Sequence, residues 1–358
     1  MRISSWRLLL PALALSTSLQ AGCSPVYVAR AAIEEAKILS RRRPITEVLA
    51  DENTQDRTRA KLNLVLQARN FAERELDLDV GESFTTYSWV ESDTLLMVLS
   101  AARKDRFQQH TWWFPIVGHV PYKGYFNFDQ AYAAAAALDR AGYDTYVRPS
   151  GAFSTLGFFN DPLLNTVLRY GDVSLASTVI HELLHNTVFV PSQVAFNESL
   201  ANFVGDRGAA TFFCTRDGES SAPCKLARDA WNDNLVYSEF LGRLIADLEE
   251  LYARPGLNGP DRVRLRETVY QESRARFQSE ARPRLRTNMF LDFTDEPLNN
   301  ASLIATRLYY DRLQLFEDAY QRHHQDLRAT ITFLVGIAKA HPNDPFGALT
   351  ETLTERSR

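Results

Sequence analysis

Two histidines stand four residues apart in the stretch HELLH at 181–185, and a glutamate directly follows the first of them. On an α-helix, residues four apart project from one face about one turn apart, so His181 and His185 can reach the same metal ion. Glu182 then lies beside that ion rather than on it, where its carboxylate can serve as a general base. The pattern predicts a zinc site that activates water, with the two histidines as ligands.

A catalytic zinc ion usually takes three protein ligands and leaves one position for water, so a third ligand is needed. We expect a helix over residues 174–190, where apolar residues recur at helical spacing, and a second helix that begins at Ser192. Pro191 separates them. If the two helices fold back on each other at this proline, Glu198 faces the second histidine across the hairpin. Glu198 is therefore the predicted third ligand.

Two further side chains continue the face of Glu198 along the second predicted helix. Asn202 lies one turn beyond Glu198, level with His181, and Asp206 follows at the same spacing. Either could form a hydrogen bond with a ligating histidine, and such bonds fix the tautomer and orientation of the ring. We therefore expect Asn202 and Asp206 to support the metal ligands.

The same residues also allow an interpretation without metal. His181 and His185 could be core histidines with satisfied hydrogen bonds, and Glu198 could be a surface charge. A bare HExxH pattern arises by chance in roughly one chain in a hundred of this composition. The helical context, the position of Glu198 and the signs of export described below favour the metal site.

Peptide hydrolysis at such a site needs a base and a donor that stabilises the carbonyl oxygen. Zinc lowers the pKa of its water to about 7, and Glu182 is placed to take the proton and pass it to the leaving amine. The stretch RLYYDRL at 307–313 offers Tyr309 and Tyr310, which point about 100° apart on a helix. We prefer Tyr310 as the donor, and helix packing of both tyrosines is the alternative. Arg307 could bind a substrate carboxylate.

HELLH at 181–185 and NESLAN at 197–202 resemble the gluzincin metallopeptidases, in which HExxH is followed on the next helix by a ligand glutamate. With its N-terminal segment, the chain resembles, over most of its mature length, bacterial lipoproteins called putative aminopeptidases. The resemblance implies a zincin-like fold, one Zn²⁺ ion and action at peptide N-termini. The gap from the second histidine to the glutamate is shorter than in well-known gluzincins, so the hairpin must be tight. The metzincin pattern is excluded by Val188 and Pro191, where it requires Gly and His.

Other functions remain possible for the same residues. An endopeptidase acting on envelope proteins would use the same metal site. A non-catalytic lipoprotein could keep the fold as a metal-binding scaffold, although Glu182 argues against this, since a structural metal site does not require a base. An aminopeptidase also needs a carboxylate for the substrate's α-amine, and no motif separates the candidates Asp161, Asp172 and Glu317.

The first residues are typical of an exported chain. Two arginines precede an apolar run of about a dozen residues, too short for the roughly 20 that span a membrane. LQAGC then resembles a bacterial lipoprotein signal, with residues 1–22 removed and Cys23 lipidated. Gln20 replaces the usual leucine, and an ordinary secretory signal is the alternative. Ser24 gives no inner-membrane retention signal, so we expect a lipid anchor on the periplasmic side of the envelope, at the outer membrane where there is one.

Lipidation of Cys23 leaves Cys214 and Cys224, which bracket a short polar loop. A disulfide between them is expected in an oxidising compartment, and two unpaired thiols are the alternative. The net charge of −4, with no polybasic stretch, argues against nucleic acid as a partner. A peptide substrate and a membrane are the expected partners.

Helical spacing, strand-like alternation and helical spacing again follow one another along the chain. We expect an α+β, zincin-like fold. Residues 23–165 form N-terminal helices and a small mixed-sheet lobe, and residues 166–358 form a helical catalytic lobe, with the metal hairpin between them. The stretch STLGFFNDP at 154–162 is placed to pair with an extended peptide, and Gly157 would permit its close approach. Core packing of this stretch is the equal alternative.

Overall fold

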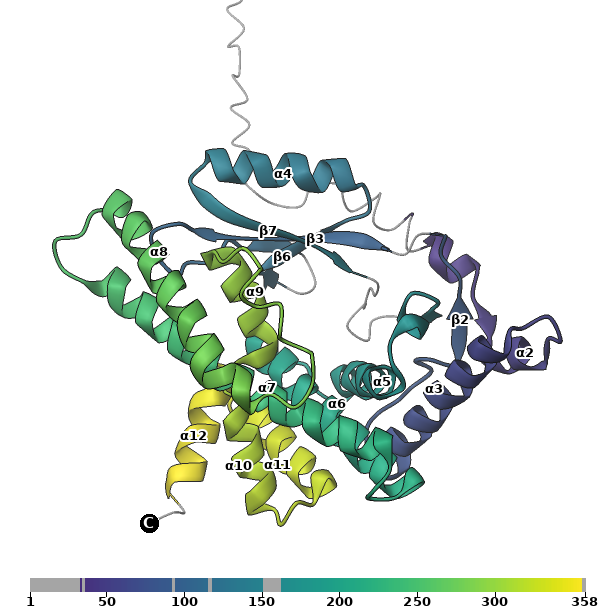
Figure 1. Ribbon diagram of the computed structural model, residues 1–358. Coiled ribbons are helices and arrows are strands. Elements are labelled where there is room, and N and C mark those ends of the chain that lie inside the picture. The colour runs from purple at the N-terminus through teal and green to yellow at the C-terminus, as the bar shows by residue number, and fades with distance from the viewer. Residues whose placement is uncertain (1–32, 34–35, 92–93, 115–117, 151–161, 356–358) are drawn as a thin grey trace, which may run out of the picture.

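The computed structural model describes residue 33 and residues 36–91, 94–114, 118–150 and 162–355 (Figure 1). Helices come first, small sheets with one helix follow, and the rest of the described chain is almost entirely helical. This α+β architecture confirms the predicted class, while the boundary between the lobes at 165/166 stays a prediction. No helix among these residues is both long and apolar enough to cross a bilayer. The predicted signal segment with Cys23 lies outside the described residues.

The N-terminal part contributes one long helix to the core. Helix α3 (Asp56–Arg74) follows the short helix α2 (Ile45–Ala50), and its buried residues Leu62, Val65 and Ala68 belong to the main hydrophobic core that also contains helix α5. A small sheet lies beside it, in the order β1 (Arg43–Pro44), β2 (Thr86–Ser88) and β8 (Leu163–Leu164).

The larger sheet has three antiparallel strands, in the order β6 (Tyr122–Tyr125), β3 (Leu96–Arg103) and β7 (Tyr143–Ser150). Helix α4 (Phe128–Arg140) covers one face of this sheet (Figure 1). Leu99 and Ala101 of β3 pack there with Ala135 of α4. The sheet thus has one apolar face closed by a helix and a second face that is turned away from α4.

The strand register decides which side chains share that second face. Directly opposed residues of an antiparallel pair point to the same side of a sheet. Ser100 is opposite both Tyr122 and Tyr146, and Val98 is opposite Arg148. Because positions 98 and 100 are two apart on β3, these five side chains lie on one face. This face is polar, in contrast to the one under α4.

A buried ion pair fastens the polar face to the helical part. Asp144 of β7 accepts hydrogen bonds from Arg266 Nη1, at 2.6 Å, and from the backbone nitrogen of Asn300, at 3.0 Å. Asn300 Nδ2 in turn donates to the carbonyl oxygen of Arg103, at 2.8 Å. These contacts fix the first turn of helix α9 against strands β3 and β7.

The strands β4 (Trp112–Phe114) and β5 (Gly118–Val120) form a separate antiparallel pair. Gly118 adopts a left-handed backbone conformation, with φ of +74°, and faces the hydroxyl group of Ser192. The strand pair therefore lies beside the turn that links helices α5 and α6.

The helical part begins with the 3-10 turn Val167–Arg169 and contains a π-helical turn at Phe277–Ala281 and a 3-10 turn at Arg282–Arg284. Its α-helices are α5 (Asp172–Thr187), α6 (Val194–Asp217), α7 (Ala222–Ala253), α8 (Gly259–Arg276), α9 (Asn300–Tyr310), α10 (Leu313–Arg322), α11 (Leu327–Ala340) and α12 (Pro345–Glu355). Cys214 and Cys224, near the α6–α7 junction, are at disulfide distance, 1.93 Å between sulfur atoms, as predicted.

Helices α5 and α6 approach closely because α6 has glycine where it meets α5. A Cβ atom at Gly205 would lie 2.7 Å from the carbonyl oxygen of Ser177, a distance that requires a shift of the backbone. One turn later, Gly208 faces Ile180 of α5. The close contact holds the two helices as the antiparallel hairpin that carries HELLH and Glu198.

Candidate active site

The turn between α5 and α6 is tied down by the asparagine that precedes Glu198. The sequence predicts a helix up to Val190, but α5 ends at Thr187. The backbone nitrogen of Val190 donates a hydrogen bond to Asn197 Oδ1 at 2.9 Å, and Asn197 Nδ2 donates one to the backbone oxygen of Val190 at 2.8 Å. Ser192 then turns with φ of +64°. Because these bonds replace helical ones, the connection stays short, and Glu198 is fixed in the first turns of α6.

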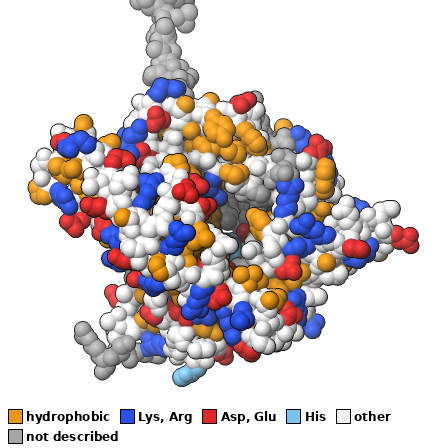
Figure 2. Space-filling view, in the orientation of Figure 1, with side chains coloured by type: hydrophobic (Ala, Val, Ile, Leu, Met, Phe, Trp, Pro, Cys, Tyr) orange, Lys and Arg blue, Asp and Glu red, His pale blue; other side chains and the backbone are white. Residues whose placement is uncertain are grey.

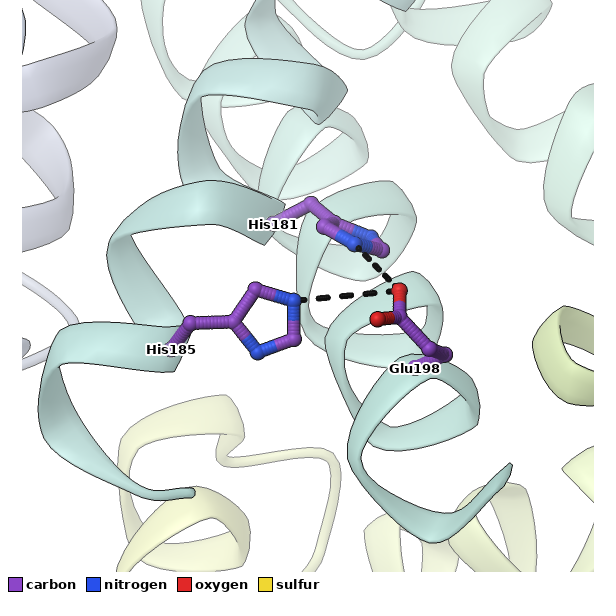
Figure 3. Close-up of side chains that lie close together, drawn as sticks. All are labelled: His181, His185 and Glu198. Atoms are coloured by element: carbon purple, nitrogen blue, oxygen red, sulfur yellow. Dashed lines mark ion pairs between the residues drawn. The ribbon is translucent and has the colours of Figure 1, made fainter. Parts of the chain in front are cut away.

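The predicted ligands converge (Figure 3). The Nε2 atoms of His181 and His185 lie 3.3 and 3.8 Å from Oε2 of Glu198. The two imidazole rings are 5.0 Å apart and nearly perpendicular, at 83°. One ligand atom from each of the three residues lies within 4.8 Å of the others. His185 and Glu198 are buried, and His181 is 9% exposed.

The three side chains influence one another's charge. Burial alone would raise the pKa of Glu198, but hydrogen bonds from His181 and His185 hold it well below its usual range. Burial lowers the pKa of His181, and the carboxylates of Glu198 and Glu182 outweigh that effect and raise it. Glu198 is therefore an anion directed at two imidazole nitrogens.

This donor set fits a zinc ion. Two imidazole nitrogens and one carboxylate oxygen are the protein ligands of a common type of catalytic zinc site, which leaves a fourth position for water. The second ring nitrogen of His185, Nδ1, is buried and has no hydrogen-bond partner among the described residues. His185 is thus oriented by its contact with Glu198 on the Nε2 side, where a metal ion would bind.

Glu182 faces the same space as the three converging residues. Its side chain is half-buried, whereas the leucines that follow it in HELLH are buried in the core. Its charge raises the pKa of His181 and also those of Tyr122 and Tyr309. Glu182 is therefore a carboxylate beside the three potential ligands that remains accessible.

The structure places Tyr309, not Tyr310, at this site. The ring of Tyr309 stacks near that of His181, at 6.4 Å and 28°. The ring of Tyr310 packs edge-on against Tyr237 and Phe290, at 5.2 and 5.6 Å. The preference for Tyr310 is therefore corrected, because the helix turns that ring into the aromatic cluster beside α7. The charge of Glu198 and burial raise the pKa of Tyr309, so its hydroxyl stays protonated and can donate.

Asn202 serves Tyr309 rather than a histidine. Its Nδ2 donates to the backbone oxygen of Tyr309 at 2.8 Å. Ser199, next to the potential ligand Glu198, donates to the oxygen of Leu308 at 3.0 Å and accepts from the nitrogen of Asp311 at 3.0 Å. Helix α6 thus carries one potential ligand and also holds the end of α9 that carries the tyrosine.

Asp206 acts on His181 through space. It accepts hydrogen bonds from Ser177 Oγ, at 2.5 Å, and from Asn234 Nδ2. Its charge contributes to the raised pKa of His181. Asp206 therefore influences the potential ligand His181 by its charge, while its hydrogen bonds come from Ser177 of α5 and Asn234 of α7.

The sheet supplies two residues that the sequence did not single out. Burial raises the pKa of Tyr122 of β6 well above its usual value, and the nearby charges of Glu198 and Glu182 add to this rise. The guanidinium of Arg148 lies 5.9 Å from the ring centre of Tyr309. The alternation in YKGY and YDTYVRPS was a usable signal, but the pairing of the two strands with β3 was needed to place both residues on one face of the sheet.

Figure 2 shows a hollow in this face of the molecule, between the surface over α4 and the surface over the helical part.

The family model described as Putative aminopeptidase matches residues 26–344. The chain belongs to this family. No curated protein and no solved structure matches the chain.

Within the described part of the chain, three residues that the sequence suggested for substrate binding in this aminopeptidase family member are not found beside the potential ligands. Gly157 and Asp161 lie outside the described residues. Arg307 pairs with Glu249 and Asp311, at 3.6 and 3.3 Å, rather than facing the three potential ligands.

Two other carboxylates considered for the substrate's α-amine in this aminopeptidase family member are already paired. Asp172 binds Lys61 at 2.6 Å, at the start of α5. Glu317 is buried and accepts from Arg207 Nε at 3.0 Å and Trp231 Nε1 at 2.9 Å. Asp172 thus links α5 to α3, and Glu317 links α10 to α6 and α7.

Proposed function

We propose that the protein is a zinc-dependent aminopeptidase with a zincin-like site. The observation that carries this proposal is the convergence of His181, His185 and Glu198 beside an accessible Glu182. Membership of the aminopeptidase family supports peptide-bond hydrolysis. The three converging side chains would hold the ion. Bound zinc would polarise the peptide carbonyl and lower the pKa of a water molecule to about 7.

The chain's own residues supply the proton transfers and the oxyanion donor. Glu182 accepts a proton from the attacking water and delivers it to the nitrogen of the leaving amine. Tyr309, which stays protonated, donates a hydrogen bond to the carbonyl oxygen as negative charge develops there. Asn202 and Ser199 hold Tyr309 in place through the backbone of α9.

Paired peptides test this function. The full chain, purified from bacterial cells and loaded with zinc, is assayed with peptides that have either a free or an acetylated N-terminus. Glu182→Gln is the control, because it keeps the size of the side chain and removes the base. Cleavage of only the free peptides, lost in the variant and on chelation of the metal, is the expected result.

The other outcomes separate the alternatives. Cleavage of both peptide types would establish an endopeptidase with the same site. Stoichiometric zinc binding without cleavage of any peptide would contradict the proposal and favour the metal-binding scaffold.

We also propose that the protein is anchored in the bacterial envelope through lipidated Cys23. The support is the N-terminal pattern, since two acyl signals on one cysteine give firm anchoring. Mass spectrometry of the purified N-terminus tests it, with Cys23→Ala as the control. An unmodified cysteine, or an unchanged membrane fraction in the variant, would contradict the anchor.

A further inference from the structure

The sheet wall of the site carries a positive charge. Arg148 is opposite Val98 on β3 and shares the polar face with Tyr122 and Ser100. This face is turned toward the helical part, because Asp144 on the same strand and the same face is bonded to α8 and α9. Arg148 is therefore on the face of the sheet that is turned toward the helical part.

Ring distances place Arg148 close to the three potential ligands. Its guanidinium lies 5.9 Å from the ring centre of Tyr309, which lies 6.4 Å from that of His181. If the two distances lay in one straight line, Arg148 would be separated from His181 by about four residues of extended chain at ~3.3 Å each, and this is the largest separation they allow. A peptide bound at the metal would therefore pass within reach of Arg148. The pKa of Tyr122 and that of Tyr309 are both raised, and the charge of Arg148 offsets part of each rise, in agreement with its position beside both tyrosines.

Arg148 differs from other arginines that lie near buried carboxylates. Arg266 pairs with Asp144, and Arg207 pairs with Glu317. With the described residues, Arg148 forms no such ion pair. Arg148 as a whole is half-buried. A planar guanidinium binds a carboxylate through two parallel hydrogen bonds, which gives direction as well as charge.

We propose that Arg148 binds a carboxylate of the peptide substrate, so that the site selects anionic peptides. This inference rests on the proposed peptidase function and names its substrate class. The carboxylate comes either from an acidic side chain next to the cleaved bond or from the free C-terminus of a short peptide. Both present the same group to the guanidinium, and the experiment below distinguishes them.

Two matched peptide pairs test the subsite in the zinc-loaded full chain. Leu-Asp-amide is compared with Leu-Asn-amide for the side chain, and Leu-Ala is compared with Leu-Ala-amide for the C-terminus. We expect kcat/KM for the carboxylate member of one pair to exceed that of its amide by about 10- to 100-fold, the usual contribution of a charged hydrogen-bonded contact. The pair that shows the preference identifies the source of the carboxylate.

Substitution then assigns the preference to the residue. Arg148→Met should bring the ratio of kcat/KM between the carboxylate peptide and its amide close to one, mainly through a change in KM. Arg148→Lys should restore part of this ratio. Arg103→Met is the matched control, because this arginine belongs to the same sheet but lies over Tyr143 on the opposite face. It should keep the full ratio.

Two results would overturn the subsite. One is a ratio near one for both pairs in the unaltered protein. The other is an equal loss of kcat for all four peptides in Arg148→Met, which would mean that Arg148 acts only through Tyr309.

A binding measurement separates failure of the subsite from failure of the proposed function. Calorimetry with Glu182→Gln, with and without Arg148→Met, reports binding of the same peptides without turnover. Tighter binding of the carboxylate peptide, lost with Arg148→Met, would support the subsite even if the unaltered protein cleaves nothing. Equal binding of both members of each pair would overturn it.

Discussion

The two walls of the site are built in different ways. The metal wall comes from one hairpin, in which His181, Glu182, His185 and Glu198 lie within 18 residues of one another. The opposite wall comes from strands β6 and β7 and from helix α9, whose residues are far apart in the chain. Helical spacing determines the first wall, whereas strand pairing and helix docking determine the second. The residues proposed for metal binding and proton transfer therefore come from a local pattern, and those proposed to position the substrate come from tertiary structure.

The largest effect is expected on the metal wall. Glu182→Gln should lower kcat by about 10²- to 10⁴-fold, since general-base catalysis contributes that much. Bound zinc, measured by atomic absorption, should stay at one ion per chain, because Glu182 is not a ligand. Loss of zinc together with activity would show that Glu182 belongs to the ligand set and would change the assignment of this wall.

A smaller loss is expected on the opposite wall. Tyr309→Phe should lower kcat by about a hundredfold through loss of one oxyanion donor, with a modest change in KM. Tyr310→Phe is the matched control, because that ring packs against Tyr237 and Phe290. Steady-state kinetics of the two variants compare them directly. A larger loss in Tyr310→Phe would restore the preference drawn from the sequence.

The contact between the walls should have a still smaller effect. Asn202→Ala removes the bond that holds the backbone of Tyr309, and kcat should fall about tenfold, within the range of a single hydrogen bond. If Asn202 acts by positioning the tyrosine, its removal should cost much less in a Tyr309→Phe background. A double-mutant cycle measures this coupling, and simple additivity would contradict the positioning role.

The smallest effect concerns pH and the metal-free protein. The pKa of Glu198 is lowered, so its contribution to stability is present above about pH 4.3 and is lost as the pH falls through its folded value. The pKa of His181 is raised, so its contribution is present below about pH 6.5 and is lost as the pH rises through its folded value. The chelated protein should therefore have a lower Tm at pH 8 than at pH 6.

Zinc should reverse this trend, because ligation requires a neutral imidazole and so competes with protons. The difference in Tm between zinc-loaded and chelated protein should increase from pH 6 to pH 8. Glu198→Gln should flatten the profile of the chelated protein, since it removes the carboxylate that faces His181. A chelated profile that rises toward pH 8 would contradict the His181–Glu198 coupling.

The sequence was sufficient where one pattern determined the geometry. Helical spacing placed His181 and His185 on one face, and Pro191 located the turn that brought Glu198 opposite them. The end of α5 was placed too late, because the side-chain bonds of Asn197 to Val190 replace helical bonds and spacing alone does not reveal them.

The opposite wall needed information that one sequence does not carry. Tyr309 and Tyr310 are adjacent, and only the docking of α9 against α6 and α7 decides which ring reaches His181. Tyr122 and Arg148 share a face only through their separate pairings with β3. Arg307 was a plausible carboxylate-binding residue until Glu249 and Asp311 were placed beside it.

Helix α9 is hydrogen-bonded at both ends, so its length sets the distance between the sheet and helix α6. Its first turn is bonded to the sheet through Asn300 and Asp144, and its last turn is bonded to α6 through Ser199 and Asn202. The helix has 11 residues, so at ~1.5 Å per residue it is roughly 16 Å long. The width of the opening above the metal hairpin is thus set by the length of one helix. Under the proposed function, a gap of constant size would select among peptides, and one helical residue more or less would change which chains can enter.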